Sequence, residues 1–143
     1  MYSLDAMYLM TCTALVESKL THLKQLPVGP AIGLCQIEWA TYLDCKRYLD
    51  TRPVLRLKIL LYCERTNLPE SPSTFMSDLA LQVLMMRVKY WMIPEAIPTY
   101  KDSISQANYH ELYYNCNHSN DKSAEFIKFA GEIGGWINHG EEV

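Results

Sequence analysis

The sequence predicts a mainly α-helical protein that forms one domain over residues 1–143. Three observations lead to this fold class. The length suits one compact domain. Hydrophobic residues make up 49% of the chain and charged residues 20%, which is enough to form a packed core. Apolar residues recur at helical spacing, and the sequence hints at extended backbone only in a short piece within residues 31–38.

The first predicted helix covers residues 3–18 and is apolar on all sides, which is typical of a buried helix. Ser3 or Asp5 can cap its start. Residues 19–38 contain two prolines and two glycines, so we expect this segment to be largely irregular.

Further helices are predicted at residues 39–49, 53–64, 74–92, 101–114 and 122–133. The helix at 53–64 has proline in its first turn and an apolar stripe made of Val54, Leu57 and Leu61. The helix at 74–92 is the longest and is apolar on two sides, so we expect it to be central. Gly134 and Gly135 are expected to stop the last helix.

Charge and cysteine content argue against several classes of protein. The net charge is −3 and no cluster of Lys and Arg occurs, so neither nucleic-acid binding nor adhesion to anionic membranes is expected. Five cysteines without a CxxC spacing favour free thiols in a reducing cytoplasm. The four histidines show no i,i+4 pair, so we expect no metal and no cofactor.

The sequence also lacks the features of export and membrane insertion. Residues 1–18 contain neither Lys nor Arg, so the positive region of an export signal is missing. No segment approaches the roughly 20 apolar residues that span a bilayer. If the protein acts outside the cytoplasm, we expect something else to carry it there.

Glu17, at the end of the first predicted helix, is the first candidate catalytic residue. Burial and the negative end of the helix dipole both favour the protonated carboxyl group, so we expect a raised pKa. A carboxylic acid that stays protonated near neutral pH can donate a proton to a glycosidic oxygen. The alternative is an inert glutamate at a helix end.

Glu38 is the second candidate carboxylate, because it follows a glycine-containing loop and precedes Trp39. It can orient a water molecule, and a separation of about 6.5–9.5 Å from the first carboxyl group would be typical of an inverting glycosidase. The alternative, equally weighted, is a first-turn glutamate that interacts with the dipole of the next helix.

Two further groups of residues have both a functional and a structural interpretation. Tyr113, Tyr114 and Asn115 end a predicted helix, and their hydroxyl and ring groups can bind a carboxyl group or a sugar. Core packing is the favoured interpretation for Tyr113, and sugar binding is slightly favoured for Tyr114. Cys35 with His110 or His118 can form a thiol–imidazole pair, but a buried structural thiol is favoured.

The order of three motifs resembles that of the soluble lytic transglycosylase and goose-type lysozyme superfamily. Glu17-Ser18 ends the first helix, GLCQIE follows after a loop, and Tyr114-Asn115 ends a later helix. More narrowly, GPAIGLCQIEWATYLD, RVKYWMIPEAIP and YYN…EFIKFAG look like segments of small phage peptidoglycan-degrading proteins. The likeness covers residues from about 8 to about 131. Trp39 departs from it, since the phage proteins tend to have proline there.

The resemblance implies a lysozyme-like helical domain with a substrate groove. It implies cleavage of the β-1,4 bond between N-acetylmuramic acid and N-acetylglucosamine. Glu17 matches the catalytic glutamate of the superfamily, and Tyr114 the tyrosine that orients it. The resemblance assigns substrate binding to Ser18, Gly33, Gln36, Tyr114 and Asn115.

Together these observations predict a phage muralytic enzyme, either a lytic transglycosylase or a lysozyme. Its expected partners are bacterial peptidoglycan and virion or tail proteins, without nucleic acid or membrane insertion. The protein is expected to be made in the host cytoplasm and to act on the bacterial cell wall. A virion-associated protein is favoured, and an endolysin released through holin pores is a close rival. The alternative classes are an inactive glycan-binding or structural virion component and a helical scaffold unrelated to glycans.

Overall fold

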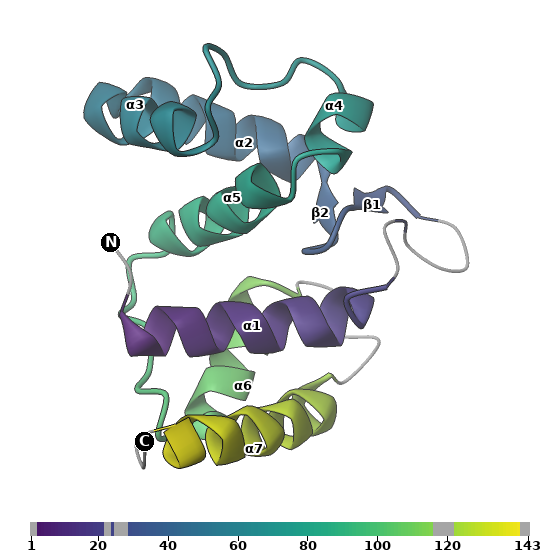
Figure 1. Cartoon of the computed structure of the whole chain (residues 1–143), viewed down its shortest axis with the longest axis vertical. Helices are drawn as coiled ribbons and strands as arrows, with labels where there is room; N and C mark the ends of the chain where they lie inside the picture. The colour runs from purple at the N-terminus through teal and green to yellow at the C-terminus, as the bar shows by residue number, and fades with distance from the viewer. Residues whose placement is uncertain (1–2, 22–23, 25–28, 116–121, 141–143) are drawn as a thin grey trace. The chain divides into compact units, whose positions relative to one another are not determined.

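The computed structural model of the chain describes residues 3–21, 24, 29–115 and 122–140, with side chains described up to residue 134. These residues are mainly helical, which confirms the mainly α-helical class (Figure 1). The lysozyme-like domain with a substrate groove stays a prediction. They divide into two compact units, Met1–Val16 with Ile93–Val143 and Glu17–Met92. The expectation of one domain over residues 1–143 stays a prediction.

The helices and strands come in the following order along the chain. The elements are α1 (Leu4–Ser18), β1 (Ala31–Ile32), β2 (Ile37–Glu38), α2 (Trp39–Asp50), α3 (Pro53–Tyr62), α4 (Pro72–Met76), α5 (Leu79–Trp91), α6 (Ser103–Tyr113) and α7 (Ser123–Gly140). No helix in the described ranges is both long and apolar enough to cross a bilayer.

The unit Glu17–Met92 contains a small antiparallel hairpin made of β1 and β2. Its register pairs Ala31 with Glu38 and Ile32 with Ile37. This hairpin confirms the short extended piece expected within residues 31–38. Because β2 ends where α2 begins, the hairpin continues directly into the helical part of the unit.

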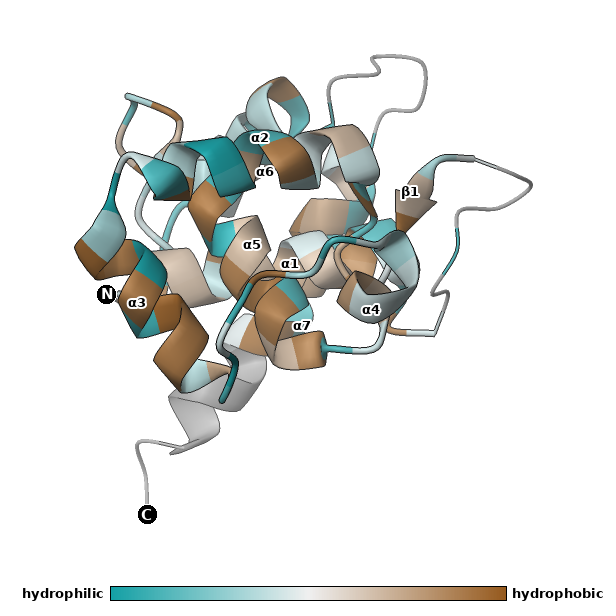
Figure 2. Cartoon of the chain, turned by 90° about the horizontal axis from the view of Figure 1, so that it is seen from above, coloured by the Kyte–Doolittle hydropathy of each residue, from teal (hydrophilic) through white to brown (hydrophobic). Residues whose placement is uncertain are grey.

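The helices α2 and α3 pack against each other. Pro53 stands at the start of α3, as expected from its missing N–H group. The apolar stripe of α3 lies at the surface, because Val54, Leu57 and Leu61 are 69%, 56% and 68% exposed. The buried residues are instead Ile59 and Leu60. Within its unit α3 packs mainly on α2, so a single narrow face is covered and the apolar stripe stays outside (Figure 2).

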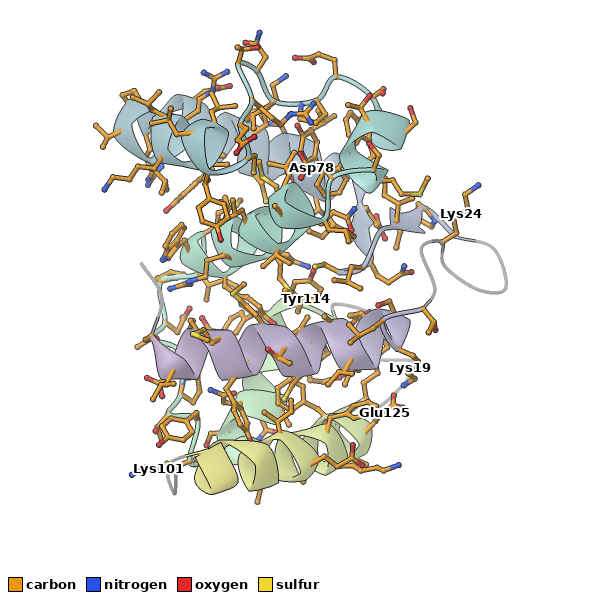
Figure 3. The ribbon with its side chains drawn as sticks, viewed as in Figure 1. Lys19, Lys24, Asp78, Lys101, Tyr114 and Glu125 are labelled. Atoms are coloured by element: carbon orange, nitrogen blue, oxygen red, sulfur yellow. The ribbon has the colours of Figure 1, made fainter. Side chains whose placement is uncertain are left out.

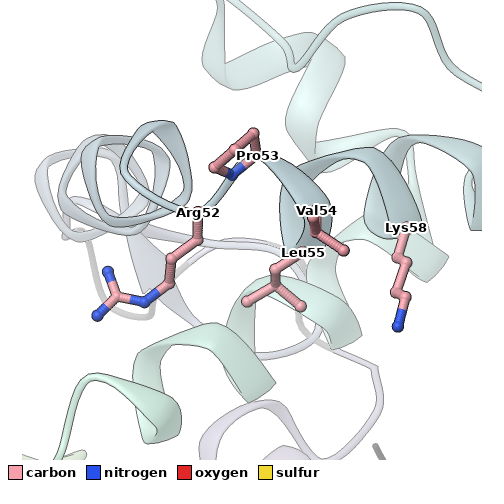
Figure 4. A pocket seen from close by; sticks show the side chains of 5 residues that line it. All are labelled: Arg52, Pro53, Val54, Leu55 and Lys58. Atoms are coloured by element: carbon pink, nitrogen blue, oxygen red, sulfur yellow. The ribbon is translucent and has the colours of Figure 1, made fainter.

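The start of α3 forms a shallow, mostly apolar pocket, which is lined by Arg52, Pro53, Val54, Leu55 and Lys58 (Figure 4). The side chains of Val54 and Leu55 give it an apolar wall. The pocket contains no carboxylate and none of the predicted site residues.

The predicted helix at 74–92 is wrong as a continuous element, because the chain leaves the helical conformation between α4 and α5. Asp78 has extended dihedral angles, φ −115° and ψ 93°, and its carboxylate accepts a hydrogen bond from Leu81 N at 2.9 Å (Figure 3). This side-chain cap satisfies a helix N–H group and starts α5 anew. With 18 residues, α7 is longer than α5 with 13.

The central position predicted for this part of the chain is confirmed for α5. Its buried residues lie on several sides of the helix and are Leu81, Gln82, Leu84, Met85, Met86, Arg87, Val88 and Tyr90. Within its unit α5 packs against α2 and α4. A polar residue, Gln82, is thus completely buried in a helix made mostly of apolar side chains.

The other unit contains α6, α7 and α1 up to Val16. Ser3 Oγ accepts a hydrogen bond from Ala6 N at 3.2 Å, so Ser3 caps α1. Asp5 instead accepts a bond from Tyr100 N at 2.8 Å, and its carbonyl accepts one from Gln106 Nε2 at 3.0 Å. These bonds join the start of α1 to α6 and the segment before it.

The burial expected for α1 is found on most of its circumference. Nine of its side chains are buried, namely Ala6, Tyr8, Leu9, Met10, Cys12, Thr13, Ala14, Val16 and Ser18. Leu4 and Met7 are exposed on the remaining side.

The expected stop at Gly134 and Gly135 is wrong, because α7 continues to Gly140. Gly134 serves close packing instead. A Cβ atom at position 134 would lie 3.1 Å from Tyr8 Oη. The Tyr8 hydroxyl donates a hydrogen bond to the Ala130 carbonyl one turn earlier in α7. Glycine inside a helix lowers stability, because it loses more conformational entropy on folding than other residues. Its presence at position 134 is explained by the room that it leaves for Tyr8.

Candidate functional site

The candidate acid Glu17 lies in the last turn of α1 and is half-buried. Its carboxylate interacts electrostatically with the GLCQIE segment. Burial, and then the Glu17 carboxylate, raise the pKa of the Cys35 thiol to about 12. A carboxylate that acts on this thiol has to be near it, because charge interactions weaken with distance. The structure therefore brings Glu17 and the turn between β1 and β2 together within one unit.

The chain turns sharply directly after Glu17. Ser18 is 1% exposed, and its Oγ accepts a hydrogen bond from Leu20 N at 3.1 Å. Lys19 and Leu20 follow with φ of 54° and 56°, in the left-handed region. The hydrogen bond that Ser18 Oγ accepts thus stabilises the turn at the end of α1. The role of Ser18 in substrate binding stays a prediction.

The turn between the strands is closed by its own glutamine. Gln36 N and Gln36 Nε2 both donate to the Gly33 carbonyl, at 3.1 and 2.8 Å. Gly33 has φ +78° and Gln36 has φ 47°, so the turn uses two left-handed residues. The first of them suits glycine because the left-handed region is costly for other residues.

Burial alternates along the whole hairpin. The odd positions, Ala31, Gly33, Cys35 and Ile37, are buried, whereas the even positions, Ile32, Leu34, Gln36 and Glu38, are half-exposed or exposed. Within the strands this alternation is the rule for extended backbone, whereas residues 33–36 form the turn. Gln36 in the turn and Glu38 at the end of β2 are both accessible to solvent.

Gln82 holds this turn in place, and sequence reasoning missed it. Its Oε1 accepts a hydrogen bond from Leu34 N at 2.6 Å. Its Nε2 donates to the carbonyls of Met76 and Phe75 at 2.7 and 3.2 Å. A Cβ atom on Gly33 would collide with the amide, 2.7 Å from Gln82 Cδ. The available signal was a glutamine within an apolar stretch, since a buried polar side chain needs partners.

The second candidate carboxylate, Glu38, is exposed at the N-cap position of α2. Its side chain makes no capping hydrogen bond there. The alternative was that Glu38 only interacts with the start of the next helix. No side-chain hydrogen bond to α2 supports that alternative. The separation expected between the carboxyl groups of Glu17 and Glu38 stays a prediction.

Tyr114 and Asn115 belong to the other unit. The Tyr114 ring is 6% exposed and stacks on His110, with ring centroids 5.7 Å apart at 18° (Figure 3). Asn115 Nδ2 donates to the Glu111 carboxylate at 3.1 Å. The contact of Tyr114 with Glu17 that the resemblance implies, and a substrate-binding role for Asn115, stay predictions. Tyr113 packs against Tyr109 at 4.7 Å, in keeping with a packing role.

The described cysteines are free thiols with little nucleophilic character. Burial raises the pKa of Cys12 and Cys45 to about 12, as it does for Cys35. A nucleophilic or metal-binding cysteine needs the thiolate, which a raised pKa disfavours. These values support the interpretation of Cys35 as a buried structural thiol.

Several residues considered for chemistry lie outside the described part of the chain, namely His22, Cys116, His118 and the side chain of His139. Among the residues that are described, no group of three or more His, Cys, Asp or Glu side chains could hold a metal ion. The expectation of a protein without metal or cofactor stays a prediction.

Comparisons with protein families, with curated proteins and with solved structures found no match to this chain.

Proposed function

We propose that the protein cleaves the glycan strands of bacterial peptidoglycan, at the β-1,4 bond between N-acetylmuramic acid and N-acetylglucosamine, with Glu17 as general acid. One observation carries this proposal. The Glu17 carboxylate lies near enough to Cys35 to raise the pKa of its thiol. The helix-end glutamate and the GLCQIE turn are therefore neighbours, as a site built from these two motifs requires.

The surroundings of Glu17 support a role as proton donor. The residue is half-buried at the carboxyl end of a helix, where the dipole disfavours a negative charge. Protonation of the glycosidic oxygen by this carboxyl group weakens the bond to the leaving sugar. The glutamate is left as a carboxylate, which can take a proton in the next step.

Two alternative second steps can follow protonation of the glycosidic oxygen. In the first, the acetamido group of the substrate assists and Glu17 acts as base, so that a 1,6-anhydro sugar forms. In the second, a water molecule attacks, oriented by the exposed carboxylate of Glu38. The two products differ by one water molecule, and mass spectrometry of the released sugars distinguishes them.

The decisive variant is Glu17→Gln, which keeps the size of the side chain and removes the acid. We expect this variant to release far fewer soluble muropeptides from purified cell walls than the unmodified protein. Glu64→Gln is the matched control, because Glu64 is exposed on the loop after α3 and should not affect activity. Full release by Glu17→Gln would end the assignment of the acid, and circular dichroism would verify that each variant is folded.

The second candidate function is a glycan-binding or structural virion component that has lost catalysis. It is favoured by the turn itself, since Gln36 is held by the Gly33 carbonyl and forms a fixed polar surface. Retention of the protein on cell walls without release of muropeptides would support this function and exclude the enzyme. Detection in purified virions by mass spectrometry would separate a virion-associated phage protein from an endolysin.

A further inference from the structure

We propose that Trp39 is a stacking platform for an N-acetylhexosamine ring and forms a glycan subsite beside Glu38. The inference rests on the proposed function, because it takes the substrate class from there. It adds a binding residue that the motifs did not identify.

Trp39 is the outermost of three packed aromatic rings. Its ring centroid lies 4.6 Å from that of Tyr42 at an angle of 17°, and Tyr42 lies 4.7 Å from Phe75. Tyr42 and Phe75 are completely buried, and the Tyr42 hydroxyl donates to the Pro69 carbonyl at 2.9 Å. The two inner rings are therefore fixed, and they hold the indole of Trp39 in one orientation.

The indole itself is only half-buried. Tyr42 covers one of its faces, so a sugar ring can stack only on the opposite face. The face of an aromatic ring is electron-rich, and it attracts groups with partial positive charge. The C–H groups on one side of a pyranose ring have this character, and they form a flat apolar surface that can stack on an indole.

The polar neighbour of Trp39 suits the same ligand. Glu38 precedes Trp39 in the chain and is exposed, and its side chain makes no capping bond to α2. A carboxylate accepts hydrogen bonds from sugar hydroxyl groups and from the N–H of an acetamido group. A half-buried indole with an adjacent exposed acceptor offers both kinds of contact that an N-acetylhexosamine needs.

The platform lies within reach of the predicted cleavage site. Trp39 lies three positions after Gln36, a span of at most about 11 Å even in a fully extended chain. Both residues belong to the unit that contains Glu17. A ring that stacks on Trp39 and a ring at the turn of the hairpin can therefore belong to one glycan strand.

Binding without catalysis tests the platform. The probe is the tetramer of β-1,4-linked N-acetylglucosamine, titrated into Glu17→Gln protein by isothermal calorimetry. We expect Trp39→Ala in this background to weaken binding by about three- to tenfold, the range for loss of one aromatic stacking contact. Trp39→Phe keeps a ring and should retain most of the affinity. Trp91→Phe is the control for changing an indole elsewhere in the same unit.

Thermal unfolding of each variant separates binding from packing. A lower melting temperature of Trp39→Ala with unchanged affinity would show that the indole only packs, and would overturn the inference. Failure of the tetramer to bind the Glu17→Gln protein would also overturn it. Tryptophan-dependent binding by a protein that releases no muropeptides would instead refute the proposed cleavage and keep the subsite. Release of muropeptides with unaltered binding by Trp39→Ala would refute only the subsite.

Discussion

Substitution of Gly33 by alanine tests whether Gln82 fixes the turn beside Glu17. Gly33 has φ +78°, and an added Cβ would lie 2.7 Å from Gln82 Cδ and closer still to Oε1. The amide is held on its other side by two backbone carbonyls, so it cannot move away without losing those hydrogen bonds. The methyl group therefore either displaces the amide or shifts the turn.

The expected cost has two contributions. A residue with a Cβ atom in the left-handed region costs about 1–2 kcal/mol relative to glycine. Loss of the Leu34 N–Gln82 Oε1 bond, which measures 2.6 Å, leaves a partly buried N–H unpaired and costs about 1–3 kcal/mol. The free energy of unfolding of Gly33→Ala should thus fall by about 2–5 kcal/mol. In a chain of 143 residues, a middle value lowers the melting temperature by about 10 °C.

The assay is denaturation with guanidinium chloride, followed by helical circular dichroism. Gly131→Ala is the matched control, since a Cβ there meets no atom within 4 Å and alanine favours the helix. It should leave stability unchanged or slightly raised. The double variant Gly33→Ala with Gln82→Ala should lose less than the sum of the single losses, because the colliding amide is gone. Equal stability of Gly33→Ala and Gly131→Ala, or strict additivity, would refute the reasoning.

The remaining predictions concern packing, thiol reactivity and pH. Gly134→Ala should destabilise the protein by about 1–3 kcal/mol through overpacking against Tyr8, and Tyr8→Phe should reduce that loss, as measured by chemical denaturation. In a Cys116→Ser background at pH 8, Cys63 should react with a thiol reagent before the buried thiols of Cys12, Cys35 and Cys45, as followed by mass spectrometry. Equal rates would contradict the raised pKa values of the three buried thiols. Hydrogen bonds from Ser105 N and Oγ lower the pKa of Asp102 below 3.8, so its contribution to stability is complete above pH 3.8 and is lost as the pH falls through the lower folded value. Asp102→Ala should therefore melt below the unmodified protein at pH 7, and this difference should disappear in strong acid.

The sequence predicted the helices well where local signals agree with packing. The start of α2 at Trp39, the first-turn proline of α3 and the extended piece at residues 31–38 were all visible in local sequence patterns. These signals depend on backbone chemistry, which acts within a few residues.

The errors arose where the apolar pattern hid a local cap or where a distant partner decides the outcome. Asp78 interrupts the apolar period of residues 74–92 because its carboxylate caps a new helix, a role that the stripe pattern hides. Gly134 was expected to end the last helix. It lies within α7 instead, where it makes room for Tyr8, which is far away in the sequence. Apolar periodicity identified a stripe on α3, but it could not show whether a neighbour covers that stripe, which is exposed.

The candidate site divides in the same way. Glu17 and the turn containing Cys35 were singled out because the order of their motifs resembles that of a known superfamily, and the effect of Glu17 on the pKa of Cys35 places the two close together. Gln82 was not predicted, because 48 residues separate it from the backbone group that it binds. Trp39 was noted only as a departure from a resemblance, and its packing on Tyr42 became visible in three dimensions.

The amide of Gln82 couples two parts of the protein that usually vary independently. Buried residues of a helix ordinarily affect the stability of a protein, whereas surface loops ordinarily determine ligand recognition. Here a small rotation or shift of α5 moves the loop above it, since Leu34 follows the side chain to which it is bonded. Substitutions in the interior of α5 should therefore change the conformation of the turn at Leu34 as well as the stability of the protein.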